Sequence, residues 1–537
     1  MENKMNLNHF KLAIIAATAL SSIAITHVHA EGVLRLNEVA VGEIDPAKAS
    51  DYADSILMFN IYDTLVVPNQ GRGGFAAHLA TSFEVQDKVF TFTLREGVKF
   101  HSGNIMSAED VVFSLNRLKS MGLGLSYLFG DVETIEATDA NTVKFTLNKP
   151  SASFIASLVR LPIIDKKAIM ANIVKSDEDK DDMGDWGEKY LSTNSAGTGA
   201  YKVTSHNPQD ETVMQKNPNY FLDIDKAAPS EVRLRYGLEA ATVRTLISQN
   251  KHDISSQWLP PEVLKALAKG GSQLLVEKGT QEFYIKMNTA KAPLDDVHCR
   301  LALSNAFDYN SVLKLVSITD DVAMGSAATG AIPSGMLGEK PESEKLVRNL
   351  DAAKKHLSAC KYDPKDFEIN ISWISEVPLE ERFALLMQAN FAEIGVKSKI
   401  TKMPWALFAE QVSKAENTPH ISQLFVNAVT GDPDTLLFGQ YHSSVSGTWQ
   451  SPEHLKDAIV DQALEQGRSA STIKLREAAY SKLNERLIEI APSIYGYNVQ
   501  AVFAASNRVK VPALSDPEKS FGLEGMGFTF RLMQINE

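Results

Sequence analysis

A strand end, a tight turn and a helix with a marked start follow one another in residues 100–117, FHSGNIMSAEDVVFSLNR. Ser102 and Gly103 predict the turn. Ser107 stands three residues before Asp110, which is typical of a capping box, where the serine oxygen accepts a free backbone N–H of the first helical turn. The apolar residues that follow recur at helical spacing, and they are Val111, Val112, Leu115 and Leu118. By itself, the segment predicts a well-capped amphipathic helix that serves as scaffold.

The chain has 537 residues, which is too long for one hydrophobic core, so we expect two or three lobes. Hydrophobic residues make up 44% of it and charged residues 22%, a balance that leaves apolar surface for each lobe to bury. The sequence has no internal repeat and no low-complexity linker. Short crossings, rather than a flexible tether, must therefore join the lobes.

The pattern of apolar residues predicts two hairpins in the first part of the chain and an alternation of strands with helices after about residue 198, which is typical of α/β lobes. Strands are expected at 33–41, 83–85, 89–94, 132–137, 142–147, 199–203, 212–216, 231–236, 254–258, 274–276, 282–287, 369–374, 396–401, 421–427, 494–499 and 509–511. Helices are expected at 51–62, 107–118, 238–250, 261–268, 297–307, 310–315, 345–360, 379–394, 405–413 and 471–490.

The first thirty residues have the pattern of a secretory signal peptide. Lys4 and Lys11 bracket a short polar segment, an apolar run covers residues 12–25, and Val28 and Ala30 supply apolar or small residues before a cleavage site. A membrane anchor is the weaker interpretation, because the run is shorter than the ~20 residues that span a bilayer. We therefore expect cleavage after Ala30 and a periplasmic protein of a Gram-negative cell.

Net charge is −12, which disfavours nonspecific binding of nucleic acid or of an anionic membrane. The sequence holds two cysteines, Cys299 and Cys360, which in an oxidising compartment could form one disulfide or stay as two buried thiols. Neither cysteine has the spacing of a metal ligand, and among the twelve scattered histidines His101, His252 and His298 have no paired histidine at ligand spacing. We expect no metal, no cofactor and no nucleic-acid partner.

No catalytic motif is present in the sequence. It contains neither the G-x-S-x-G turn of a serine hydrolase nor the H-E-x-x-H pair of a zinc peptidase. An exported hydrolase is thus a weak alternative, and the protein is predicted not to be an enzyme.

Four stretches, in order, resemble the extracytoplasmic solute-binding proteins of ABC importers, family 5, the peptide, nickel and opine type that includes dipeptide- and oligopeptide-binding proteins. Ser102 stands where that family usually has Asp, and Ser107 where it usually has Thr. The stretches are residues 100–117; GTGAYKV at 197–203 with QKNPNY at 215–220; MNTAKAPLDDVHCRLALSNAFDYN at 287–310; and IGV at 394–396 with GDPD at 431–434.

The resemblance implies an α/β periplasmic-binding-protein fold of two lobes (cluster C type) with an extra α+β subdomain. A ligand would lie in the cleft between the lobes and would be enclosed by hinge closure. The implied parts are a signal peptide at 1–30, a first lobe from 31–58, 198–285 and 496–537, an extra subdomain at 59–197 and a second lobe at 286–495.

The implied function is to bind a di- or oligopeptide and deliver it to the permease subunits of an ABC importer, as a monomer. In peptide binders of this family, an Asp just before the GDPD-like turn anchors the ligand's α-amino group, and Val429 stands at that position here. An unpaired ligand ammonium there would cost several kcal/mol. Either the ligand has no free N-terminus, or another acid supplies the charge. Glu376, Glu380 and Glu381 are candidates, although acids are also normal at a helix start.

Rigid aromatic side chains suit sequence-tolerant binding of peptides or sugars. The candidate ligand-binding residues include such aromatic side chains together with nearby polar and apolar ones. They are Glu43, Tyr127, Trp258, Trp373, Glu376, Trp405, Phe425, Asn427, Val429 and Trp449. Because Val429 replaces the usual Asp, the ligand could instead be an opine, a cationic amine, an oligosaccharide or a nickel chelate. A periplasmic chaperone or receptor domain is a further alternative.

Overall fold

The computed structural model describes residues 32–38, 42–70, 74–175, 183–470 and 472–536. The predicted signal peptide, residues 39–41 of the first expected strand and residue 471 of the last expected helix lie outside these ranges. Within the described ranges, no helix combines the length and the apolar character needed to cross a bilayer.

One sheet has four strands, with parallel pairing between its first two strands and antiparallel pairing between the others. Ile254 extends it by single bridges to Leu36 and Ala505, so the expected strand at 254–258 is reduced to one bridging residue. The helix α1 (Tyr52–Ile61) packs on this sheet in a common core. The strand order is β1 (Val33–Glu38), β10 (Glu231–Tyr236), β9 (Glu211–Lys216) and β8 (Tyr201–His206).

A second four-stranded sheet contains the two predicted hairpins, which are confirmed. The predicted helix is α2 (Ala108–Met121); it begins at the Ser107–Asp110 capping box and ends at Gly122 in the left-handed conformation. The apolar face of α2 packs on the sheet in a core of its own. The sheet order is β4 (Ala80–Gln86), β5 (Val89–Leu94), β7 (Thr142–Leu147) and β6 (Val132–Ala137). The hairpin β2 (Val66–Pro68) and β3 (Phe75–Ala77) and the helices α3 (Phe154–Ser157), α4 (Lys166–Met170) and α5 (Glu188–Leu191) complete this part.

The third sheet has six strands and helices on both faces. Its order is β12 (Gly325–Ser326), β16 (Ser493–Ala505), β11 (Gln273–Met287), β15 (Ile421–Asn427), β13 (Glu368–Ile374) and β14 (Lys397–Met403). One face packs on α8 (Val297–Ala306), α9 (Tyr309–Leu315), α10 (Leu350–Ala359) and α11 (Leu379–Ala392). The other face packs on α12 (Trp405–Gln411), α13 (Pro433–Tyr441), α14 (Ala458–Ser469) and α15 (Ile473–Ile490). The helices α6 (Ala240–Ser248) and α7 (Pro261–Lys269) form a smaller core against β16.

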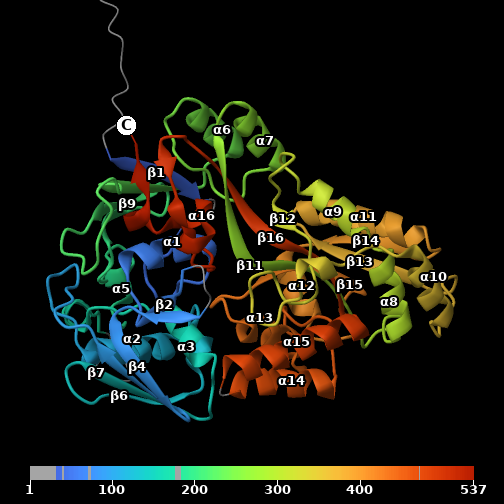
Figure 1. Cartoon of the computed structure of the whole chain (residues 1–537), viewed down its shortest axis with the longest axis horizontal. Coiled ribbons are helices and arrows are strands. Elements are labelled where there is room, and N and C mark those ends of the chain that lie inside the picture. The colour runs from blue at the N-terminus through green and yellow to red at the C-terminus, as the bar shows by residue number, and fades with distance from the viewer. Residues whose placement is uncertain (1–31, 39–41, 71–73, 176–182, 471, 537) are drawn as a thin grey trace, which may run out of the picture. The chain divides into compact units, whose positions relative to one another are not determined.

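The two long strands β11 and β16 connect the two lobes (Figure 1). Residues 273–278 of β11 pair with the end of β16 beside the first sheet, and residues 282–287 belong to the six-stranded sheet. The prediction of two separate strands, 274–276 and 282–287, was wrong. Gly279 and its polar neighbours resemble a break in the sequence, but the chain continues there as a strand with a register shift between Lys278 and Glu282. The mixed α/β architecture of two lobes confirms the predicted fold class.

Gly197 and Gly199 explain why the segment GTGAYKV needs glycines. The backbone of Gly199 passes so close to the end of α1 that an added Cβ would lie 2.4 Å from the Asn60 carbonyl oxygen. The Gly199 N–H donates to the Ile61 carbonyl at 3.2 Å. Thr198 between the glycines donates to Asp63 at 2.6 Å. The motif therefore fixes β8 against α1.

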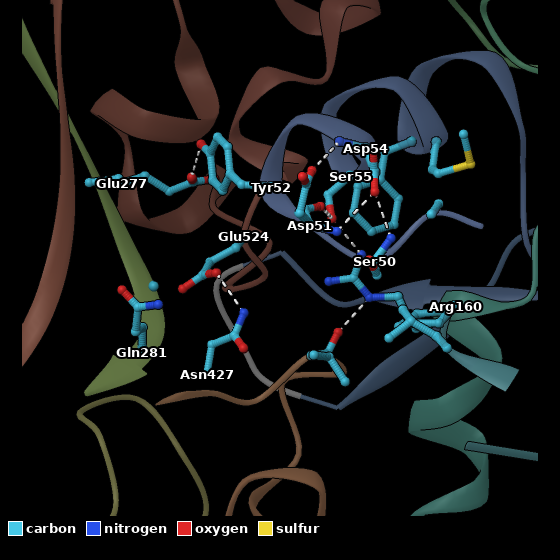
Figure 2. A pocket seen from close by; sticks show the side chains of 18 of the residues that line it. Ser50, Asp51, Tyr52, Asp54, Ser55, Arg160, Glu277, Gln281, Asn427 and Glu524 are labelled. Carbon is cyan, nitrogen blue, oxygen red and sulfur yellow. Dashed lines mark hydrogen bonds between the residues drawn. The ribbon is translucent and has the colours of Figure 1, made fainter. Parts of the chain in front are cut away.

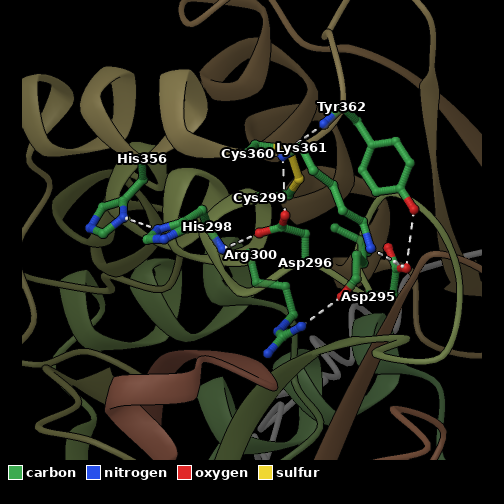
Figure 3. The surroundings of a disulfide bond; sticks show 10 residues. Asp295, Asp296, His298, Cys299, Arg300, His356, Cys360, Lys361 and Tyr362 are labelled. Carbon is green, nitrogen blue, oxygen red and sulfur yellow. Dashed lines mark hydrogen bonds and ion pairs between the residues drawn. A yellow bond between two sulfur atoms is a disulfide. The ribbon is translucent and has the colours of Figure 1, made fainter.

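Cys299 and Cys360 form a disulfide between α8 and the end of α10 (Figure 3). The bond decides between the two states that the sequence left open, since the described residues hold no free cysteine. His298 and His356 lie beside it, with their Nδ1 atoms 3.1 Å apart in a hydrogen bond. The α10 helix starts at Leu350, later than predicted, because Asn349 caps it.

Candidate ligand-binding cavity

A cavity of about 260 Å³ lies where β11 and β16 cross between the two lobes. Its walls come from eight separate parts of the chain, so no single sequence motif contains it. The lining residues are Pro46, Ala49, Ser50, Asp51, Tyr52, Asp54, Ser55, Met58, Phe59, Thr64, Leu125, Val159, Arg160, Pro162, Gln257, Trp258, Glu277, Gly279, Gln281, Asn427, Val429, Val499, Ala501 and Glu524.

The start of α1 supplies two carboxylates to this wall, and both are engaged by the backbone. Asp51 accepts from the Asp54 N–H at 2.9 Å, and Asp54 accepts from the Asp51 N–H at 3.0 Å, which is a complete capping box. Asp54 also accepts from the backbone N–H groups of Glu43 and Ser50, each at 2.6 Å. Burial and the neighbouring Asp54 raise the pKa of Asp51 to about 6. These two acids therefore hold the chain before α1 in place.

The same loop is held from behind by α2. The Arg117 guanidinium donates from both terminal nitrogens to Asp45, at 2.7 Å each, and both side chains are 1% exposed. Its Nε donates to the Trp186 carbonyl at 2.7 Å. The family-like segment 100–117 thus positions Pro46, the first lining residue of the cavity, without reaching the cavity itself.

Arg160 is the positively charged group of the cavity lining. Its Nε donates to the Val429 carbonyl, its Nη1 donates to Ser55 Oγ at 2.9 Å, and its guanidinium lies 5.0 Å from the centre of the Phe59 ring. No carboxylate of the described residues forms an ion pair with it. Burial lowers its pKa to about 10, so it remains a cation at neutral pH.

Glu277 and Glu524 face the cavity from β11 and from the C-terminal segment (Figure 2). Glu277 is buried; it accepts from the Tyr52 hydroxyl and from the Gly527 N–H. Glu524 accepts from Asn427 Nδ2 at 3.0 Å. Burial raises the pKa of both carboxyl groups. The pKa of Glu277 reaches about 7, because the negative charge of Glu524 raises it further.

Residues 152–160, of which Val159 and Arg160 line the cavity, contact α14 and the segment that follows β15. Ser153 donates to Asp434 at 3.0 Å, and the Ala152 N–H donates to the Arg468 carbonyl at 3.0 Å. Asp434 is also paired with Arg468, and Asp432 caps α13 and pairs with Arg476. The GDPD acids are therefore structural.

Three of the ten predicted ligand residues, Trp258, Asn427 and Val429, line the cavity, and the side chain of Trp258 is 61% exposed there. Val429 takes part through its carbonyl, which Arg160 holds.

The other seven lie outside the lining. Glu43 accepts from its own loop, and Tyr127 is exposed in a short 3-10 turn. Trp373 and Phe425 are packed on the face of the six-stranded sheet that contacts α8 to α11. Trp405 and Trp449 contact each other with ring centres 5.4 Å apart, and Glu376 accepts from the Trp405 N–H.

The two other acids considered from the sequence are also placed. Glu380 is buried and accepts from the Ile374 N–H at 2.8 Å, and Glu381 is exposed in the first turn of α11. Arg160, Glu277 and Glu524 line the cavity but are not among the residues predicted from the sequence. Glu277 lies where two strands were expected to be separated, and the other two stand in segments with no recognisable motif.

The model of the bacterial extracellular solute-binding proteins, family 5, matches residues 74–448. The chain belongs to this family. Its members are binding proteins that act outside the cytoplasm, as the resemblance of the four stretches predicted.

The chain is similar to the probable D,D-dipeptide-binding periplasmic protein DdpA of Escherichia coli, with 26% identity over 474 residues that cover 87% of this chain and 88% of that protein. It is 28% identical to heme-binding protein A of Haemophilus influenzae over 411 residues, 70% of each chain. Among solved structures, HbpA2 of Haemophilus parasuis superposes with a TM-score of 0.78 at 24% identity, over 92% of this chain and 98% of the other, and shows the shared fold.

Proposed function

We propose that this protein binds a short peptide, a di- or oligopeptide, and delivers it to the permease subunits of an ABC importer. The observation that carries the proposal is the pair of opposite charges in one cavity: the Arg160 guanidinium faces it from one wall, and the Glu277 and Glu524 carboxylates from another. A free peptide carries an ammonium and a carboxylate at its two ends, which match these groups.

Cavity size favours the short end of this range. About 260 Å³ lies just below the roughly 300–1,000 Å³ of typical small-molecule sites, so a di- or tripeptide fits better than a long chain. The similarity to a protein named for D,D-dipeptides points the same way.

We also propose the division into lobes and subdomain at the boundaries given above, with opening and closing around β11 and β16. This division is supported by the hydrophobic cores, which are separate for the two four-stranded sheets and for residues 283–497. Closure excludes water and strengthens the polar contacts to the ligand. The periplasm as compartment, a monomeric state and the absence of enzymatic activity belong to the same proposal.

A non-peptide solute is the second candidate, and Val429 favours it. An aliphatic side chain in place of the family's ammonium-binding Asp weakens the argument for a free N-terminus at that position. The similarity to a protein named for heme shows that relatives take solutes of other chemistry.

A thermal-shift screen of the mature protein tests the proposal. Di- and tripeptides, sugars, amines, opines and metal chelates are compared, because a ligand that binds only the folded state raises the melting temperature by mass action. At a ligand concentration of 100 Kd the stabilisation is about 2.7 kcal/mol. We expect peptides to raise the melting temperature; a shift with chelates or sugars alone would reject the peptide class.

A further inference from the structure

We infer that Glu524, backed by Glu277, is the subsite for a positively charged group of the ligand and takes over the role of the acid that Val429 lacks. This inference rests on the proposed solute-binding function. It concerns which residues of this chain recognise the ligand's cation, and it places them on the C-terminal segment and on β11.

Glu524 and Glu277 have no cationic partner within the described residues. Glu277 is bonded to the Tyr52 hydroxyl and a backbone N–H, and Glu524 to the Asn427 amide. The other two acids of the lining, Asp51 and Asp54, are engaged in the capping box of α1. Of the four carboxylates in the lining, these two are therefore the ones whose negative charge is neither used to cap a helix nor paired with a cation.

The electrostatics of the cavity favour a cation beside these two acids. Two carboxylates in one desolvated cavity each disfavour ionisation of the other, and a cation near both relieves the repulsion and the cost of burial. Arg160 acts on Glu524 at longer range, but no ion pair joins them. An ammonium has three N–H donors, and the Glu524 and Glu277 carboxylates are acceptors in the lining of the same cavity (Figure 2).

Glu524 contacts the strand end that precedes Val429. Asn427 holds the Glu524 carboxylate and stands two residues before Val429 on the same strand end. Gly279 opposite it makes room, since an added Cβ would lie 2.5 Å from Glu524 Oε1. Glu524 thus reaches the region of the family's missing acid from the other side, while the Val429 carbonyl holds Arg160 instead.

The arrangement also predicts proton release on binding. The titratable groups around Glu277 are Tyr52 from α1 and Glu524 from the C-terminal segment. The negative charge of Glu38 of β1 raises the pKa of Tyr52. Burial and Glu524 keep the pKa of Glu277 near 7, so part of the population carries a proton at neutral pH. A bound cation lowers that pKa, and the proton passes to the buffer.

The test is calorimetric titration with alanyl-alanine in L,L and D,D form, with the N-acetylated dipeptides, and with 1,5-diaminopentane. Wild-type protein is compared with the variants Glu524→Gln, Glu277→Gln and Gly279→Ala. The Gly279→Ala variant keeps both carboxylates, but its added Cβ displaces the Glu524 side chain. Glu518→Gln is the matched control, because Glu518 is an exposed acid of the same C-terminal segment. Buffers of different ionisation enthalpy measure the protons released, and thermal melting checks that each variant folds.

We expect Glu524→Gln to weaken binding of the free dipeptide roughly tenfold to a hundredfold, because a charged hydrogen-bond partner is lost. Acetylation of the dipeptide should have a similar effect on wild type, and Glu277→Gln should reduce proton release. Equal affinity of wild type and Glu524→Gln for the free dipeptide, or of wild type for free and acetylated dipeptide, overturns the inference and leaves the peptide function intact. Binding of the diamine alone, lost in Glu524→Gln, supports the inference and rejects the peptide. No binding of any probe contradicts both.

Discussion

Removal of the Arg117 side chain should destabilise the protein strongly, although Arg117 never reaches the cavity. The guanidinium makes a two-pronged pair with Asp45, at 2.7 Å for each contact, and a third hydrogen bond to the Trp186 carbonyl. Both partners of the pair are 1% exposed. In Arg117→Met the methionine fills much of the same volume, but the Asp45 carboxylate stays buried without its cation.

The expected magnitude follows from that burial. Breaking a buried ion pair from one side costs about 3–5 kcal/mol, because the remaining charge is left uncompensated. The double variant Arg117→Met with Asp45→Asn should recover part of this loss, since a neutral amide is cheaper to bury than a carboxylate. The loop that Asp45 holds continues into Pro46, which lines the cavity, so ligand affinity should fall as well.

Differential scanning calorimetry and urea unfolding measure the change. Arg233→Met is the matched control: Arg233 pairs with Glu211 and Glu231, but its side chain is 40% exposed, so about 0–1 kcal/mol is expected. A loss below about 1 kcal/mol in Arg117→Met, or no difference from the control, would refute the reasoning.

Three further predictions concern stability. Burial raises the pKa of Glu380 to about 8 from an ordinary value of 4.5, so the folded state keeps a proton that the unfolded state loses. The free energy of unfolding of wild type should therefore fall by up to about 5 kcal/mol as the pH rises from about 4.5 to about 8. Urea titrations at a series of pH values should show that Glu380→Gln lacks this fall. The double variant Cys299→Ser with Cys360→Ser should lose about 4 kcal/mol, because the disulfide closes a loop of 61 residues, and wild type under reducing conditions should match it. Gly199→Ala should cost roughly 1–3 kcal/mol or more by forcing a Cβ against the Asn60 carbonyl, whereas the same substitution at Gly237, which has open space but a φ of +63°, should cost about 1 kcal/mol.

Much of the fold could be predicted because local patterns and family motifs agree with the final packing. The capping box at Ser107 and the two hairpins depend on neighbours in sequence, and the structure has them where they were expected. The strand at 273–287 could not be predicted, because its continuity through Gly279 depends on pairing with β16, more than 200 residues away. The helices α13 and α14 were missed; α13 starts at a Pro that resembled a turn.

The site was harder to predict than the fold. Aromatic residues near strand ends, such as Trp373 and Phe425, are candidates from the sequence. In the structure they pack in or against the core on one face of the six-stranded sheet and lie outside the cavity lining. An aromatic ring at a strand end has no signal in the sequence that tells a core from a cleft. The acid that faces the cavity from the C-terminal segment, Glu524, stands between glycines in a stretch without periodicity. Only the three-dimensional meeting of this segment with Asn427 and Glu277 marks it.

Titration calorimetry of the protein with di- and tripeptides, at two temperatures, tests most directly whether it binds short peptides. We predict saturable binding of one peptide per chain, with a negative heat-capacity change from the apolar surface that closure removes from water. Binding should weaken when the cavity is filled by Ala501→Trp, a substitution of a lining residue on β16. The absence of saturable heat with every di- and tripeptide, or unchanged binding in the filled variant, would contradict the assignment of this cavity and of its ligand.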